Sequence, residues 1–264
     1  KNTREFRRGD EITMLDMLLF VLIVLPFIAG FLCLALKNHS ARAAVVVLTS
    51  IVLMIASVML LFNGSFEYTV GAQWNEIITI LDFVLLAYIL FQGFYNWKAH
   101  PVFAATIVIC AIASLAMVAY FDFVMVHHFE AEFPSFFADE LSIIMVLIIS
   151  IVGSLICIFG IPYMREHEEH LHLEKTRQPR FFLYLVLFLG AMNGIVLANN
   201  IPWLLFFWEI TTLCSFMLIG HDKTEIATVN CMRALALNML GGVGFTAGLM
   251  LLFNNAQTLS LMDV

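Results

Sequence analysis

The sequence predicts an all-α protein, a polytopic bundle of about eight membrane-spanning helices. Of its 264 residues, 62% are hydrophobic and only 12% are charged, and the mean hydropathy is +0.95, which is far from the composition of a soluble domain. Apolar runs of roughly 20 residues, the length that crosses a hydrocarbon core about 30 Å thick, recur along the chain. Because these runs are continuous and not alternating, they exclude a β-barrel.

The apolar runs give the helices in chain order. The expected spans are 17–36, 43–62, 77–96, 102–126, 141–161, 181–199, 201–219 and 234–253. The first run is too long for the apolar region of a cleaved signal peptide, so it counts as a span. Together the spans form one transmembrane helical domain over residues 14–264.

The basic residues support the same boundaries. Every second loop carries lysine or arginine: Lys37, Arg42, Lys98, Arg165, Lys175, Arg177, Arg180, Lys223 and Arg233. The alternate loops, at 63–76, 127–140, 200 and after 253, carry none. Since Lys and Arg collect in cytoplasmic loops, we expect a multi-pass protein of the inner or plasma membrane with its basic loops in the cytoplasm.

The first residues of the chain break this alternation. Lys1, Arg4, Arg7 and Arg8 would lie on the non-cytoplasmic side. Met14, placed directly before an apolar run, is a natural start. Residues 1–13 are therefore interpreted as an N-terminal extension that is not native, which N-terminal sequencing of the native protein would test.

Charge and motif content exclude several classes of function. The net charge is -7 and no basic stripe is present, so we expect no nucleic-acid partner. The five cysteines lack CxxC spacing and are interpreted as buried small hydrophobes. Gly241–Gly244 does not have the GxGxxG spacing of a dinucleotide-binding motif, and we expect it to permit close helix packing. The histidines lie in loops or at helix ends, which argues against haem, and the cluster His167–His172 is interpreted as a charged loop and not a metal site.

The most informative residue is Glu209, near the middle of the run 201–219. A charge at the bilayer midplane costs about 2.5–3.5 kcal/mol on insertion scales and usually marks an ion or proton path. The alternative is a protonated glutamic acid that makes a packing hydrogen bond. Thr212 shares the helix face of Glu209, and Thr211 and Ser215 widen the polar strip.

Polar residues of other helices extend this set. Asn193 and Asn238, in the preceding and following helices, either continue the strip or bridge helices. Asp82 also lies within an apolar run, where a functional and a structural role are equally open. Asp122 lies close to the outer end of its run, and we expect it to be solvated.

Three motifs in the C-terminal half resemble one family. They are Asp139–Met145 opening a helix, Asn199–Gly220 with its Trp-Glu pair, and Arg233–Gly242. With them the chain resembles the antiporter-like, proton-translocating membrane subunits shared by respiratory complex I, formate hydrogenlyase, energy-converting hydrogenases and multisubunit cation/proton antiporters. The remainder matches this family only by hydropathy.

The resemblance implies a fold and a role for Glu209. Full subunits of this family have about fourteen helices in two inverted repeats, so the chain is expected to be the N-terminal part of a larger antiporter-like fold. The family glutamate that matches Glu209 belongs to the ion-translocation machinery and pairs with a lysine further along, which is absent here. The spans 77–96 and 102–126 are extra relative to the complex I subunit, and Gly242 stands where that subunit tends to have an acid.

These observations predict a proton- or sodium-translocating subunit of a redox-driven complex, most similar to energy-converting hydrogenase or formate hydrogenlyase. The expected ion-translocation residues are Glu209 as carrier, Thr212, Ser215 and Asn238 along the path, Arg233 tuning the field, and Asp82. We expect no cofactor in this chain and iron–sulfur and nickel–iron centres in partner subunits. The expected partners are other membrane subunits, peripheral redox subunits and the lipid bilayer. The alternatives are a multisubunit sodium/proton antiporter with no redox partner, and a non-pumping scaffold.

Overall fold

The computed structural model of the chain describes residues 14–71, 73–126, 133–172 and 175–263. The proposed extension 1–13, together with His127 and His128, lies outside the described residues. Within the described part, eight helices are long and apolar enough to span a membrane, the first over Met14–Ala35. The predicted all-α polytopic fold is therefore confirmed.

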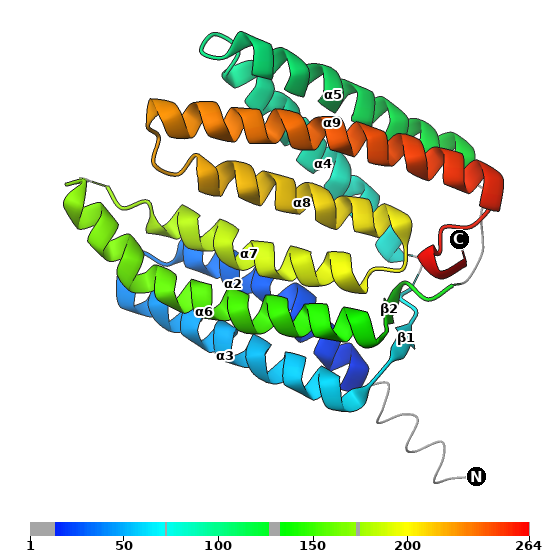
Figure 1. Cartoon of the computed structure of the whole chain (residues 1–264), viewed down its shortest axis with the longest axis horizontal. Coiled ribbons are helices and arrows are strands. Elements are labelled where there is room, and N and C mark those ends of the chain that lie inside the picture. Colours follow the sequence, from blue (N-terminus) through cyan, green and yellow to red (C-terminus); the bar gives the residue numbers. More distant parts are fainter. Residues whose placement is uncertain (1–13, 72, 127–132, 173–174, 264) are drawn as a thin grey trace. The chain divides into compact units, whose positions relative to one another are not determined.

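The described residues form two compact units, each assembled from two separate stretches of sequence. The first unit contains residues 14–68 and 138–197. Its elements are η1 (Phe20–Val24), α2 (Leu25–Ala35), α3 (His39–Asn63), β1 (Phe66–Tyr68), α6 (Glu140–His170) and α7 (Gln178–Leu197). In this unit α3 packs along α6, and α2 packs along α7 (Figure 1).

Glycine permits the close approach of helices in the first unit. A Cβ atom built on Gly190 would lie 2.7 Å from the backbone oxygen of Ile23, and one on Gly30 would lie 3.0 Å from that of Leu183. Without side chains at these two positions, α7 and the first span pack backbone to backbone.

The second unit contains residues 69–137 and 198–263 of the described part. Its elements are α4 (Gln73–Tyr95), α5 (Pro101–Tyr120), η2 (Phe121–Met125), α8 (Ile201–Ile219), α9 (Glu225–Ala256) and η3 (Leu261–Asp263), with β2 (Phe136–Ala138) at the boundary. Helix α9 packs against both α5 and α8, and α4 packs against both α5 and α8 (Figure 1). Apolar side chains such as Leu86, Ile107, Leu205 and Met232 fill the core of this unit.

Helices α6 and α9 extend furthest beyond their apolar runs. Helix α6 continues to His170, so His167 and His170 lie in its last turns and not in a loop as expected. Helix α9 begins at Glu225 because the Thr224 side chain accepts a hydrogen bond from the Ala227 amide at 3.1 Å. Arg233, expected before this helix, is an exposed residue within it. Hydropathy detects only the membrane-crossing part of a helix, and capping determines where the helix begins.

The motif that opens at Asp139 has a local structural role. Asp139 is the N-cap of α6, and its carboxylate accepts a hydrogen bond from the Ser142 amide at 2.7 Å. This bond holds the pKa of Asp139 below its ordinary value of 3.8. The cap satisfies an amide that the helix itself leaves unpaired.

The expectation of close packing at Gly241–Gly244 is wrong. A Cβ atom built on Gly241, Gly242 or Gly244 would meet nothing within 4 Å. Among the described residues of this unit, the shortest glycine contact lies at Gly93, where a Cβ atom would be 2.8 Å from Val108. Sequence spacing shows that helices can approach, whereas packing decides which glycines they use.

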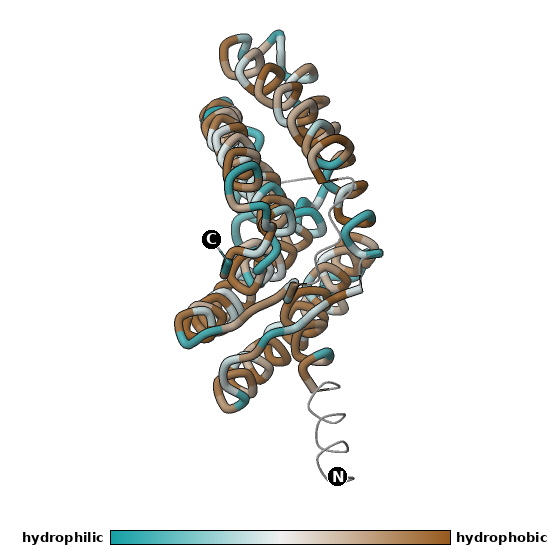
Figure 2. Tube along the Cα trace, turned by 90° about the vertical axis from the view of Figure 1, so that its right-hand side faces the viewer, coloured by the Kyte–Doolittle hydropathy of each residue, from teal (hydrophilic) through white to brown (hydrophobic). Residues whose placement is uncertain are grey.

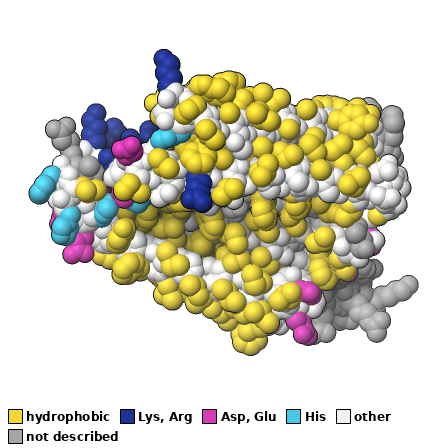
Figure 3. All heavy atoms as spheres, turned by 45° about the horizontal axis from the view of Figure 1, so that its top comes forward, with side chains coloured by type: hydrophobic (Ala, Val, Ile, Leu, Met, Phe, Trp, Pro, Cys, Tyr) yellow, Lys and Arg dark blue, Asp and Glu magenta, His cyan; other side chains and the backbone are white. Residues whose placement is uncertain are grey.

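The surface is that of a protein in lipid. Hydrophobic residues run along the helices and hydrophilic ones concentrate toward their ends and connections (Figure 2). Most of the side chains on the face in Figure 3 are hydrophobic. Large apolar side chains in the middle of spans are more than half exposed, including Ile80, Ile109 and Phe159. Such extensive apolar exposure is expected where hydrocarbon replaces water as the solvent.

Candidate functional site

Two buried carboxyl groups meet inside the second unit. Glu209 of α8 is 3% exposed and Asp82 of α4 is 5% exposed. Their side chains are hydrogen-bonded to each other. Because a carboxylate can only accept, this hydrogen bond requires a proton on one of the two groups. A proton shared by the two groups would lie between α4 and α8.

The surroundings of the pair leave polar atoms unsatisfied. The Oδ1 atom of Asp82 and the Oε2 atom of Glu209 are buried without a hydrogen-bond partner. In the described part, Asp122, another acidic residue, acts electrostatically on Asp82. A buried polar group without a partner is costly, and in a functional site it can be used to receive a proton or a water molecule.

A polar network holds the first turn of α8 in place. Trp203 Nε1 donates a hydrogen bond to Asn75 Oδ1 at 2.8 Å, and the Ile201 amide donates to the Leu259 carbonyl at 3.0 Å. Asn199 Nδ2 donates to Ser260 Oγ at 3.1 Å. These bonds tie the start of α8 to α4 and to the segment after α9, and so they fix the position of Glu209 two turns further along α8.

The other predicted site residues are placed less closely around the pair. Thr212 is buried one turn after Glu209, whereas Ser215 and Asn238 are half-buried and Arg233 is exposed. In the described part, no side-chain hydrogen bond joins Thr212, Ser215 or Asn238 to either carboxyl group. The structure thus brings together Glu209 and Asp82 and leaves these residues as further predictions for the path.

Asn193 belongs to the first unit and bridges helices there. Its Nδ2 donates hydrogen bonds to the Leu22 carbonyl at 3.0 Å and to Ser150 Oγ at 3.3 Å. These contacts join α7 to the first span and to α6. The bridging interpretation of Asn193, left open by the sequence, is the one that its contacts support.

Asp122 is not the solvated residue that its position in the sequence suggested. It is half-buried, it hydrogen-bonds with Thr79, and it lines a cavity that Asp82 also lines. The expectation failed because distance from the helix end does not show which face of the helix a residue occupies. Thr79 was missed, although it precedes Asp82 by three residues and so shares its helix face.

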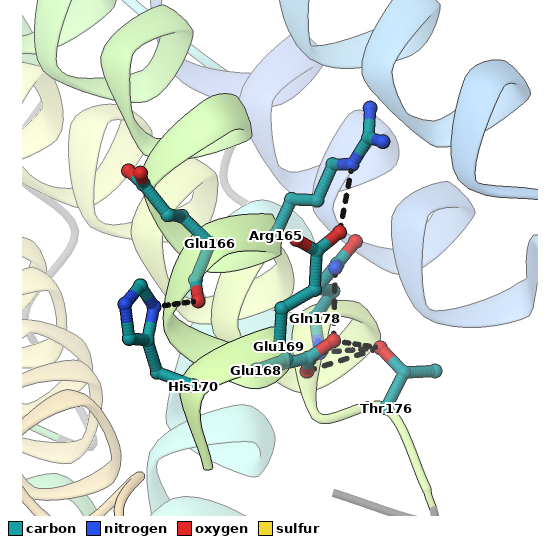
Figure 4. Close-up of polar contacts among 7 residues, drawn as sticks. All are labelled: Arg165, Glu166, Glu168, Glu169, His170, Thr176 and Gln178. Atoms are coloured by element: carbon teal, nitrogen blue, oxygen red, sulfur yellow. Dashed lines mark hydrogen bonds and ion pairs between the residues drawn. The ribbon is translucent and has the colours of Figure 1, made fainter. Parts of the chain in front are cut away.

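A second polar cluster explains the charged segment at the end of α6. Glu168 accepts hydrogen bonds from Thr176 Oγ1 at 2.9 Å and from Gln178 Nε2 at 2.9 Å (Figure 4). It also accepts one from the Arg177 amide at 2.6 Å. Gln178 Oε1 in turn accepts from the buried Arg42 at 3.3 Å. The cluster ties the ends of α3, α6 and α7 together, so a structural role accounts for it.

The fold and the buried pair place the chain in a class of protein: polytopic helical membrane proteins with acidic side chains buried among their spans. Residues 123–182 match the family described as NADH-Ubiquinone oxidoreductase (complex I), chain 5 N-terminus. Residues 198–264 match the family described as NADH:quinone oxidoreductase/Mrp antiporter, TM. In these two segments the chain is similar to the complex I and Mrp antiporter superfamily.

Curated relatives agree with this family. Over 135 residues the chain is 33% identical to the Na(+)/H(+) antiporter subunit A1 of Staphylococcus aureus strains bovine RF122 / ET3-1, JH9 and Newman. The alignment covers 51% of this chain and 16% of each relative. Glu209 lies within the second matched segment, whereas α4 with Asp82 lies outside both.

Proposed function

We propose that this chain is an ion-translocating membrane subunit of a multisubunit sodium/proton antiporter, in which Glu209 carries the proton. The observation that carries the proposal is the hydrogen bond between Glu209 and Asp82, buried in the middle of two spans. Ionisable groups inside membrane bundles are expensive and mark ion paths. A pair that holds one proton between two acids can release it and take up another.

The names of the relatives favour the antiporter over the redox-driven complex that was the main expectation. The curated relatives are antiporter subunits and not hydrogenase or formate hydrogenlyase subunits. The redox-driven pump stays as a second candidate because the descriptions of both matching families name an NADH:quinone oxidoreductase. In that candidate, iron–sulfur or nickel–iron centres would belong to peripheral partner subunits and not to this chain.

The proposed orientation places the basic loops in the cytoplasm. Lys98 and Lys223, in the connections at one end of the second unit, are basic, whereas the loop containing residue 200 at the other end has no basic residue. By the distribution of Lys and Arg, the end with the start of α8 faces away from the cytoplasm. Proteolysis or labelling of the loops in sealed vesicles of known orientation tests this assignment.

Transport in everted membrane vesicles tests the role of Glu209. We expect Glu209→Gln, made in the full-length protein and its native complex, to slow sodium-driven proton movement by about 100-fold or more, the low end for a positioned proton-transfer group. Gln preserves the size of the side chain, so the complex should still assemble. Glu76→Gln is the matched control, since Glu76 is an exposed acid in the first turn of α4. Unchanged transport in Glu209→Gln would disprove the proposal.

Co-purification separates the two candidate complexes. Mass spectrometry of the native complex, isolated in mild detergent, identifies the partner subunits. Cofactor-free membrane subunits alone are the result expected for the antiporter. Co-purifying iron–sulfur or nickel-containing subunits would instead establish the redox-driven pump.

A further inference from the structure

A small cavity in the second unit connects two acidic residues. Its volume is about 20 Å³, which is enough for one water molecule. Its polar lining comes from Asp82 and Thr79 of α4, Asp122 of η2 and Thr246 of α9. Apolar residues, including Pro202 and Leu205 of α8, complete the wall.

The polar lining is suited to hold water. Asp82 Oδ1 is buried and has no hydrogen-bond partner. Thr246 Oγ1 donates its hydrogen to the Gly242 carbonyl at 2.9 Å, so its oxygen remains able to accept a hydrogen bond. Asp122 is held by its hydrogen bond with Thr79. A water in this space would have the two to four polar partners that a buried water needs.

The two acidic residues that line the cavity lie at different depths in the unit. At about 1.5 Å per residue, Asp82 lies about 13 Å from the start of α4, and Glu209 lies about 12 Å from the start of α8. Asp122 is within one turn of Met125, where η2 ends. The starts of α4 and α8 lie together because Trp203 bonds with Asn75. The ends of η2 and α9 lie together because Phe121 packs on Phe253 with ring centroids 5.5 Å apart. The bond from the Ile201 amide to the Leu259 carbonyl, just after α9, joins the two pairs at one end of the unit.

We propose that Asp122, Thr79 and one water in this cavity form a proton access path to the Asp82–Glu209 pair from the end of the unit opposite the basic connections. The path rests on the proposed function of Glu209. An O–H bond of Asp122 breaks as the water accepts its proton, and the water passes another proton to Oδ1 of Asp82. The proton held between Asp82 and Glu209 then moves onto Glu209, and Asp122 regains a proton from the solvent at its end. No group other than protons is transferred.

This path involves a part of the chain that the family matches do not cover. Helix α4, with Thr79 and Asp82, lies outside both matched segments, and Asp122 directly precedes the first of them. The extra pair of helices noted in the sequence would therefore supply the access route, and α8 would supply the carrier.

Infrared spectroscopy can follow proton access to the pair directly. In the native complex reconstituted in lipid, the stretching band of the shared protonated carboxyl group shifts when H₂O is replaced by D₂O. The band is identified by its loss or shift in Glu209→Gln and Asp82→Asn. The rate of its shift after the exchange of solvent measures how fast protons reach the pair.

We expect Asp122→Asn to slow this exchange by about 100-fold while the band itself persists. Thr79→Val, which keeps the shape of the side chain and removes the hydroxyl, should slow it as well, and Asp122→Glu should restore the rate. Glu76→Gln, on an exposed part of α4, should leave exchange unchanged. Unslowed exchange in both Asp122→Asn and Thr79→Val would overturn the path.

The two proposals fail in different ways. Suppose that Glu209→Gln abolishes transport, but that the proton of the Asp82–Glu209 pair exchanges at the original rate in Asp122→Asn. The path is then wrong and the function of Glu209 stands. If Glu209→Gln transports normally, the proposed function is wrong, whatever the rate of exchange. If the band disappears in Asp122→Asn, the exchange rate in Thr79→Val tests the path instead, because that variant keeps all three acids.

Discussion

Asp82 of α4 and Glu209 of α8 are hydrogen-bonded to each other. In the sequence they are separated by residues 138–197, which belong to the first unit. Neither residue is satisfied by its own helix, because both side chains leave one oxygen without a partner. Removing either acid therefore leaves the other without this hydrogen bond.

Glu209→Ala should destabilise the protein by about 1–3 kcal/mol, because it leaves Asp82 buried without its hydrogen-bond partner. Glu209→Gln should cost less, since the amide can still donate a hydrogen bond to Asp82. Thermal unfolding of the two variants in the same detergent measures the difference. A larger loss for Gln than for Ala would contradict the pairing.

Arg42 should be essential for the stability of the first unit. It is 2% exposed and donates hydrogen bonds to the Cys33 carbonyl at 3.2 Å, the Leu36 carbonyl at 2.7 Å and Gln178. Arg42→Met leaves three acceptors without this donor, and the loss of even one such partner costs about 1–3 kcal/mol. The measurement is the midpoint of thermal unfolding.

The control for Arg42 is another arginine of the same unit. Arg165 is exposed, and its ion pair with Glu169 at 3.2 Å lies at the surface. Arg165→Met should change stability by less than about 1 kcal/mol, since exposed pairs contribute little. Equal effects of the two substitutions would show that burial of Arg42 has no energetic consequence.

Gly190→Ala and Gly242→Ala should have opposite effects. A methyl group at Gly190 would lie 2.7 Å from the Ile23 backbone oxygen, which cannot rotate away, so we expect a loss of about 1–3 kcal/mol from overpacking. At Gly242 a methyl group meets nothing within 4 Å, and alanine is favoured over glycine in a helix by up to about 1 kcal/mol. Unfolding midpoints of both variants check the prediction, which is wrong if Gly190→Ala is the more stable.

The Asp139 cap should make the start of α6 sensitive to acid. Because its pKa in the folded state is lower than the ordinary value of 3.8, the stabilisation is fully present above that value. It is lost as the pH falls below 3.8 through the lowered pKa and the carboxylate takes up a proton. Hydrogen exchange of the Ser142 amide should accelerate over that range relative to its intrinsic rate.

Asp139→Asn is the matched control for this cap. Asparagine is an equally good N-cap but has no carboxylate to titrate. The acid-dependent step in protection of the Ser142 amide should therefore disappear in this variant. A step that persists in Asp139→Asn would assign the acid sensitivity to another group.

The span count followed from hydropathy because lipid demands long apolar helices whatever their packing. Hydropathy predicted the helix ends less well. Helices α6 and α9 continue beyond their apolar parts, and the cap at Thr224 sets the start of α9. Gly241–Gly244 misled because its spacing permits close packing without requiring it. Asp122 was misplaced because the sequence does not say which helix faces it.

The sequence by itself determined that the chain crosses a membrane, where its helices lie and that Glu209 is an acid deep inside one of them. These properties depend on local composition and on the cost of placing a charge in hydrocarbon. Only the tertiary structure decided that Asp82 is the partner of Glu209 and that Asp122 shares a cavity with Asp82. Those contacts join helices distant in sequence, and side-chain packing and hydrogen bonding, not periodicity, select which faces meet.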